Sequence, residues 1–158
     1  MEKRLSLKEL NNVGEIEIVY RKKTNCKISE RPKITKSSDA YEILMHYWDE
    51  GKIGLLEEFK VLFLNQANRV LQIISLSQGG ITGTVADPRL ILATALKVAA
   101  CSLVLSHNHP SGSLQPSRAD EALSQKIRAA AAFHDIKVLD HLIVTADGFY
   151  SFADEGLL

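Results

Sequence analysis

The stretch from Ser102 to Asp120 reads SLVLSHNHPSGSLQPSRAD and joins two predicted elements of different kinds. Its first residues, 102–106, are mostly Leu and Val, which predicts a short buried strand. Ser117 is a residue type that caps helix N-termini, and an alanine-rich segment follows it to about Phe133. The residues between, 107–116, are rich in His, Pro, Gly and Ser, which is typical of a loop. The stretch therefore predicts a strand, a loop and a helix.

The rest of the chain also mixes strand and helix patterns. Glycines at 79, 80 and 83 interrupt these patterns. Because hairpins occur beside strand–helix–strand units, we expect an α/β (mixed α+β) sandwich, with helices flanking a central mixed β-sheet. Strands are predicted at 14–20, 58–64, 69–76, 136–144 and 149–152, and helices from Ser37 or Ser38 to about Asp49 and from Asp87 to about Ala100.

Composition indicates one folded domain with a short arm. The chain has 158 residues, 46% of them hydrophobic, which excludes a disordered chain and a collagen-like repeat. The formal net charge is zero, so nucleic acid is not the default partner. Residues 1–36 nevertheless contain 10 of the 19 basic residues and only 5 of the 19 acidic ones. We expect an arm at 1–36, with an edge strand and a basic linker, and the domain at 37–158.

The sequence pattern favours a cytoplasmic protein with no membrane partner. Residues 1–10 lack the continuous apolar segment of a secretory signal. The longest apolar run, 98–105, is too short to cross a bilayer. Cys26 and Cys101 have no metal-type spacing and form no disulfide framework, which suits a reducing compartment.

The quoted stretch also contains a candidate metal site. His107 and His109 are two residues apart, so in extended backbone their rings point the same way. Asp120 lies in the first predicted turn of the following helix, where the helix dipole favours the ionised carboxylate. Taken singly, a His-x-His pair is more often a surface feature, and Ser117-x-x-Asp120 is most simply a helix cap. Together they predict a zinc site with three protein ligands and one open position.

These residues carry a resemblance to a known family. The pattern His107-x-His109-x7-Ser117-x2-Asp120 resembles the metal-binding motif of the JAMM metallopeptidases, the metal-binding branch of the JAB/MPN domain. The fuller text, His-Asn-His-Pro-Ser-Gly followed by Pro-Ser-x-Ala-Asp, is similar to the RadC-like proteins of bacteria. Residues 139–144 (LDHLIV) and 150–156 (YSFADEG) match the C-terminal part of that family. The resemblance covers roughly residues 37–158.

The resemblance implies a zinc-dependent metallohydrolase that cleaves peptide or isopeptide bonds of a protein or peptide substrate. It also implies a glutamate at the head of an early strand, which contacts the attacking water and transfers its proton. Setting the segment FKVLFL against that strand assigns the role to Glu57, with Glu58 as the alternative on the opposite face. Ser117, close to the metal in sequence, is expected to donate a hydrogen bond to the oxyanion.

Other functions stay open beside the hydrolase. The alternative is a non-catalytic accessory or binding module associated with DNA repair or DNA metabolism, and the basic arm leaves DNA binding open. Many RadC-like proteins carry an N-terminal helix-hairpin-helix domain, for which residues 1–36 are too few, and this weakens a DNA role. Asp140 and His141 could contact the ligands or the substrate, although a polar pair at a strand end is more often structural.

Overall fold

The computed structural model describes residues 25–78 and 86–158, together with Ser6 and Gly14. The strand predicted at 14–20, most of the basic arm and the glycines at 79, 80 and 83 lie outside the described residues. Among the described helices, none combines the length and the apolar character that crossing a membrane requires.

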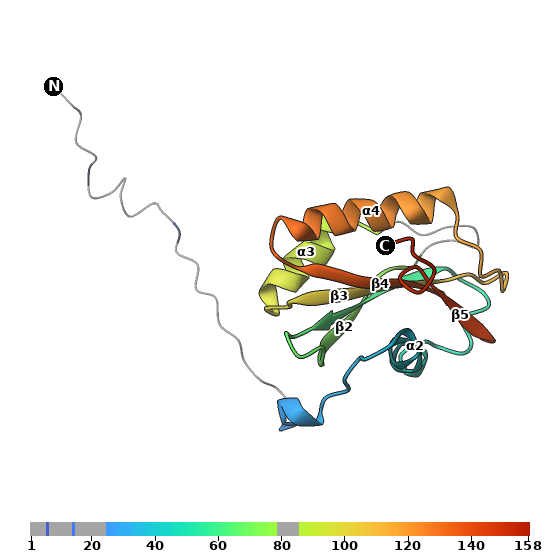
Figure 1. The fold of residues 1–158 in the computed structure, drawn as a ribbon, viewed down its shortest axis with the longest axis horizontal. Coiled ribbons are helices and arrows are strands. Elements are labelled where there is room, and N and C mark those ends of the chain that lie inside the picture. The colour runs from blue at the N-terminus through green and yellow to red at the C-terminus, as the bar shows by residue number, and fades with distance from the viewer. Residues whose placement is uncertain (1–5, 7–13, 15–24, 79–85) are drawn as a thin grey trace.

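The described part of the chain forms one five-stranded sheet (Figure 1), and this sheet is mixed, as the sequence predicted. Its strands are β1 (Glu58–Leu64), β2 (Val70–Gln78), β3 (Ser102–Asn108), β4 (Lys137–Thr145) and β5 (Gly148–Ser151). They lie in the order β2-β1-β3-β4-β5. β3 and β4 are parallel, whereas the other neighbouring strands pair antiparallel.

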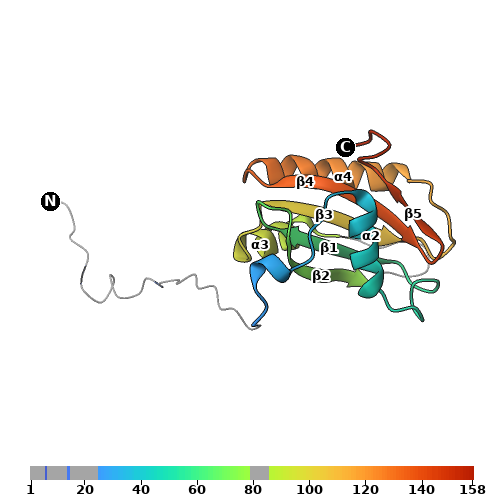
Figure 2. The same cartoon turned by 60° about the horizontal axis from the view of Figure 1, so that its bottom comes forward.

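Helices cover both faces of the sheet. They are α2 (Ser37–His46), α3 (Pro88–Lys97) and α4 (Arg118–Ala132), and a short 3₁₀ helix, η1 (Ile28–Glu30), precedes them. α3 and α4 lie on one face and α2 on the other (Figure 1), and α2 comes to the front when the molecule is turned (Figure 2). α4 connects the parallel strands β3 and β4, a pairing that requires a crossover of this kind.

The two central strands face two separate cores. β1 and β3 are buried along their whole length. Because successive side chains of a strand point to opposite faces, Leu103 and Leu105 pack under α3 and α4, whereas Val104 packs against α2. His107 continues the series of Leu103 and Leu105. The side chain of His107 therefore lies on the α3/α4 side of the sheet, at the C-terminal end of β3.

The boundaries of some elements differ from the prediction. α2 ends at His46 instead of Asp49, and α3 ends at Lys97 instead of Ala100. The backbone of Ala99 has a φ of 54°, which a continuing right-handed helix cannot accommodate. β3 extends to Asn108 rather than ending at Ser106, because β4 continues to pair with it. The first histidine is therefore a strand residue, not a loop residue.

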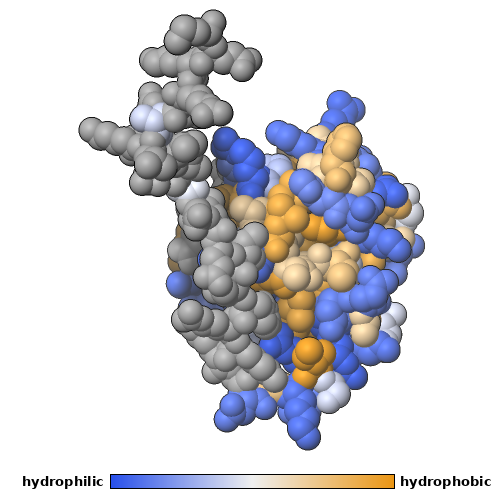
Figure 3. Space-filling view, turned by 90° about the vertical axis from the view of Figure 1, so that its left-hand side faces the viewer, coloured by the Kyte–Doolittle hydropathy of each residue, from blue (hydrophilic) through white to orange (hydrophobic). Residues whose placement is uncertain are grey.

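Two exposed hydrophobic side chains lie near the C-terminal ends of α3 and α4, away from His107. Leu96 near the end of α3 is 54% exposed and Phe133 after α4 is 89% exposed. The side of the molecule to which these helix ends belong faces the viewer in Figure 3, where hydrophobic surface lies between hydrophilic groups. A groove of about 530 Å³ lies between the end of α4 and the start of β4. It includes none of the predicted metal ligands.

Candidate metal centre

Two histidines lie at the C-terminal end of β3, on the face that packs against α3 and α4. His107 pairs with Phe59 of β1 and Ile143 of β4, and its side chain is buried. The backbone N–H of His109 donates to the carbonyl of Val144 at 3.1 Å, so the pairing with β4 continues past the end of β3. Side chains two residues apart in extended chain point to the same side. The Nε2 atoms of His107 and His109 lie 3.0 Å apart.

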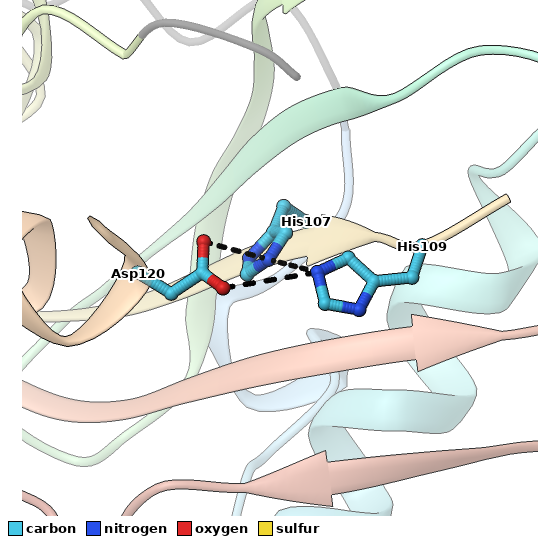
Figure 4. Close-up of side chains that lie close together, drawn as sticks. All are labelled: His107, His109 and Asp120. Atoms are coloured by element: carbon cyan, nitrogen blue, oxygen red, sulfur yellow. Dashed lines mark hydrogen bonds and ion pairs between the residues drawn. The ribbon is translucent and has the colours of Figure 1, made fainter. Parts of the chain in front are cut away.

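The third residue of the group comes from the first turn of α4. Ser117 is the N-cap, and both its N–H and its hydroxyl donate to Oδ2 of Asp120 at 2.7 Å. The N–H of Asp120 donates back to Oγ of Ser117 at 3.1 Å, which completes a capping box. Oδ1 of Asp120 lies 3.2 Å from Nε2 of His107, and Oδ2 lies 3.8 Å from Nε2 of His109. Figure 4 shows the carboxylate facing both rings.

Asp120 is held in its ionised form. Burial raises the pKa of its carboxyl, but the contact with the ring of His107 and the hydrogen bonds from Ser117 outweigh burial. The net result is a pKa well below the usual value for aspartate. The N-terminal end of α4 acts in the same direction, since its dipole favours negative charge. Asp120 is therefore a carboxylate at neutral pH, which is the form that binds a metal.

The three side chains fit a divalent cation. One ligand atom from each of His107, His109 and Asp120 lies within 4.8 Å of the other two. Two imidazole nitrogens and a carboxylate form a donor set that suits catalytic zinc, which keeps a fourth position open. The side chains of His109 and Asp120 are each 16% exposed, so the group is reachable from solvent. The structure thus brings the three predicted ligands together.

Comparison with known proteins agrees with the sequence resemblance. A model of the RadC-like JAB domain matches residues 34–157. The chain belongs to the RadC-like JAB domain family. It is 44% identical over 152 residues to a UPF0758 protein of Flavobacterium johnsoniae, a match that covers 95% of this chain and 64% of that protein. It is 41% identical over 129 residues to a UPF0758 protein of Porphyromonas gingivalis, covering 81% of this chain and 56% of that protein.

A third relative, a UPF0758 protein of Variovorax paradoxus, is 50% identical over 102 residues, which cover 65% of this chain and 45% of that protein. The RadC-like chain thus spans less than two thirds of the length of the relatives it matches. The names of these relatives state no activity. The comparisons therefore establish the family of this chain but assign no reaction to it.

Both histidines of the RadC-like domain have a second partner at Nδ1. Nδ1 of His107 lies 2.8 Å from Nε2 of His141, which is a residue of β4. Nδ1 of His109 lies 2.8 Å from the carbonyl oxygen of Ser113. Partners of this kind fix the orientation of a ligand ring and decide which nitrogen faces the metal. Each ring therefore turns its Nε2 toward Asp120.

The pair Asp140 and His141 serves two different purposes. Asp140 is buried and structural: it accepts hydrogen bonds from the N–H of His141 at 2.7 Å, the N–H of Ala153 at 3.1 Å and the hydroxyl of Ser151 at 2.6 Å. The ring of His141 instead contacts His107. Burial, and then the proximity of His107, lowers the pKa of His141 well below its usual value. His141 thus contacts a candidate ligand, whereas Asp140 has the structural role that is more common for a polar residue at a strand end.

The residue between the two histidines was not predicted to have a role. Asn108 points to the other face of the sheet, where its Nδ2 donates to the carbonyls of Ile53 at 2.7 Å and Leu56 at 2.8 Å. Its Oδ1 accepts the N–H of Glu58 at 2.7 Å. Asn108 thereby fixes the segment that contains Glu57. These partners are 50 or more residues away in sequence, so no local pattern could reveal them.

The two adjacent glutamates have different surroundings. Glu58 is buried, and its carboxylate lies 3.2 Å from Nζ of Lys60, which is also buried. The ring of Phe59 stacks on the ring of His107, with centroids 6.2 Å apart. Alternation along β1 places Glu58 on the face opposite to Phe59 and His107. Glu57 immediately precedes β1, and the same alternation extended by one residue predicts it on the side of Phe59 and His107. This placement favours Glu57 over Glu58, and its catalytic role stays a prediction.

Proposed function

We propose that this RadC-like JAB domain is a metal-dependent hydrolase that cleaves peptide or isopeptide bonds, with zinc as its metal. The convergence of His107, His109 and Asp120 at an accessible end of the sheet carries the proposal. The JAB domain family includes metallohydrolases, which supports it further. An open coordination position favours catalysis over a structural role, because structural zinc sites are closed by four protein ligands.

In this hydrolysis, the metal and the side chains of Glu57 and Ser117 would have separate roles. Zinc, when bound, would supply Lewis acidity that acidifies a water molecule and polarises the scissile carbonyl. Glu57 would accept the proton of that water and deliver it to the leaving amine. Ser117 would donate a hydrogen bond to the oxyanion on the substrate. Its hydroxyl donates to Asp120 in the structure, so this role requires the hydroxyl to rotate.

Hydrolysis by the intact chain, with and without metal, tests the proposal. Fluorogenic peptides and lysine-linked isopeptides would be incubated with protein stripped by a chelator, and with the same protein after addition of zinc. His134→Ala is a suitable control, because His134 is exposed and lies after α4, outside the ligand group. We expect cleavage that chelation abolishes and zinc restores in the parent and in this control.

The variants His109→Ala and Asp120→Ala should show no zinc-dependent cleavage. Cleavage that survives removal of the metal would contradict the proposal. Failure of the zinc-loaded parent to cleave either substrate class would instead favour the accessory or binding module.

A further inference from the structure

We propose that His141 and Ser124 are positioning residues that set the tautomer of His107, so that its Nε2 is free to bind the metal. The inference rests on the proposed metal site and deepens it. It follows from a buried series of contacts that begins and ends at Asp120. Ser124 lies one turn after Asp120 on α4, and His141 lies between Ser124 and His107.

Ser124 determines which atom donates and which accepts in each hydrogen bond of the series. Its hydroxyl lies 2.8 Å from the backbone carbonyl oxygen of Asp120, and a carbonyl can only accept a hydrogen bond. The single hydroxyl hydrogen of Ser124 is therefore used in this bond. Oγ of Ser124 is also in hydrogen-bond contact with Nδ1 of His141. Since Ser124 has no second hydrogen, Nδ1 of His141 must carry the hydrogen and donate it.

The next link follows from the burial of His141. Its side chain has no exposed surface, and its ring packs against Phe59 and Phe152 with centroid distances of 5.6 Å and 4.7 Å. Its two nitrogens contact a serine and another imidazole, and a charged ring in such surroundings would be costly. A neutral ring that carries its hydrogen at Nδ1 has a lone pair at Nε2. Nε2 of His141 is therefore an acceptor.

The last link reaches the ligand. Nε2 of His141 accepts, so Nδ1 of His107 must donate across the 2.8 Å between them. A neutral His107 with its hydrogen at Nδ1 has a lone pair at Nε2, the atom that faces Asp120. His109 reaches the same state independently, because its Nδ1 lies 2.8 Å from the carbonyl of Ser113. Both rings thus direct a lone pair at one point.

The series has a mechanical consequence as well. His107 belongs to β3, His141 to β4, and Ser124 and Asp120 to α4. Three contacts thereby connect the ligands from the strand and the helix through groups that are all buried or partly buried. Removal of such a supporting partner typically lowers metal affinity about 10–100-fold. We expect that range here.

Ring tautomers of the zinc-loaded, ¹⁵N-labelled parent test the proposal directly. Long-range ¹H–¹⁵N spectra should place the hydrogen at Nδ1 in His107, His109 and His141. The exposed His46 and His134 serve as internal references. A hydrogen at Nε2 of His107 or of His141 would overturn the proposal.

Zinc affinity of variants, measured by competition with a coloured chelator, gives a second readout. Ser124→Ala and His141→Phe should lose about 10–100-fold in affinity. His141→Gln should retain affinity within a few-fold of the parent, because its amide can donate to Ser124 and accept from His107. Ser151→Ala is the matched control: Ser151 is also a buried serine with one side-chain partner, Asp140, but it lies outside the series.

The outcomes separate this inference from the proposed function. Zinc bound equally well by the parent, Ser124→Ala and His141→Phe would overturn the positioning role and leave the metal site standing. Equal losses in Ser124→Ala and Ser151→Ala would also overturn it, because the loss would then reflect general destabilisation. A parent that binds no zinc would overturn both proposals.

Discussion

Glu57 and Glu58 are neighbours with opposite surroundings, and they provide a matched pair of variants. Glu57→Gln should lower turnover about 100-fold or more, because it removes the proposed base. Zinc content should not change, since Glu57 is not among the three ligands. Glu58→Gln should instead lower the free energy of unfolding by about 2–3 kcal/mol, because it leaves the buried Lys60 without its charge partner.

Steady-state hydrolysis, zinc content and urea unfolding distinguish these two residues. The assignment of Glu57 would be wrong if Glu57→Gln hydrolysed the substrate at the parent rate. The role of proton acceptor would belong to Glu58 instead if Glu58→Gln alone lost turnover while this variant remained folded and loaded with zinc.

For Asn108 we predict an effect on stability and turnover rather than on metal binding, because its side chain contacts no candidate ligand. Asn108→Ala removes three hydrogen bonds and leaves the carbonyls of Ile53 and Leu56 and the N–H of Glu58 without them. We expect a loss of about 2–3 kcal/mol in the free energy of unfolding. Turnover should fall more than zinc affinity, since the segment that contains Glu57 would lose its anchor.

A second asparagine provides the control for this prediction. Asn65→Ala also removes side-chain hydrogen bonds, to the N–H groups of Ala67 and Arg69, but it lies in the turn between β1 and β2. It should lower stability without changing turnover per folded molecule. Equal effects of both variants on turnover would contradict the anchoring role of Asn108.

The elements α3 and α4 have similar caps, and only one of them serves the site. Ser117 caps α4 and orients Asp120, whereas Asp87 caps α3 by accepting the N–H of Arg89 at 2.9 Å. Ser117→Ala and Asp87→Ala should each cost about 1 kcal/mol of stability. Only Ser117→Ala should also weaken zinc binding, by about 10-fold or more, because Oδ2 of Asp120 then keeps one of its two donors, the backbone N–H of residue 117, and loses the hydroxyl.

Thermal unfolding of the metal-free proteins and zinc titration check this prediction. An unchanged zinc affinity in Ser117→Ala would show that the cap stabilises the helix and does not orient the ligand. A loss of zinc affinity in Asp87→Ala would contradict the separation of the two caps.

Sequence reasoning succeeded for elements whose causes are local. The capping box of Ser117 and Asp120, the Asp87-Pro88 helix start and the two-residue spacing of the histidines depend on residues close together in the chain, and the structure contains all three features. The mixed sheet was also predictable, from hairpins beside a strand–helix–strand unit. Helix ends were less so, as the early ends of α2 and α3 show.

Interactions across the whole molecule could not be predicted in the same way. The contact between His107 and His141 depends on the parallel pairing of β3 with β4, which contains a register shift between Leu103 and Val104. Displacing a strand by one residue turns each side chain to the other face. The shift therefore determines that His141, and not a neighbour, faces the ligand. The partners of Asn108 depend likewise on the packing of a distant segment.

The zinc content of the purified, untagged chain tests the central claim most directly. Elemental analysis would compare the parent with His109→Ala, Asp120→Ala and the control His134→Ala, after addition of zinc and removal of the excess. The account predicts about one zinc per chain in the parent and the control, and little in the other two variants. A parent without zinc, or equal zinc in all four proteins, would contradict it.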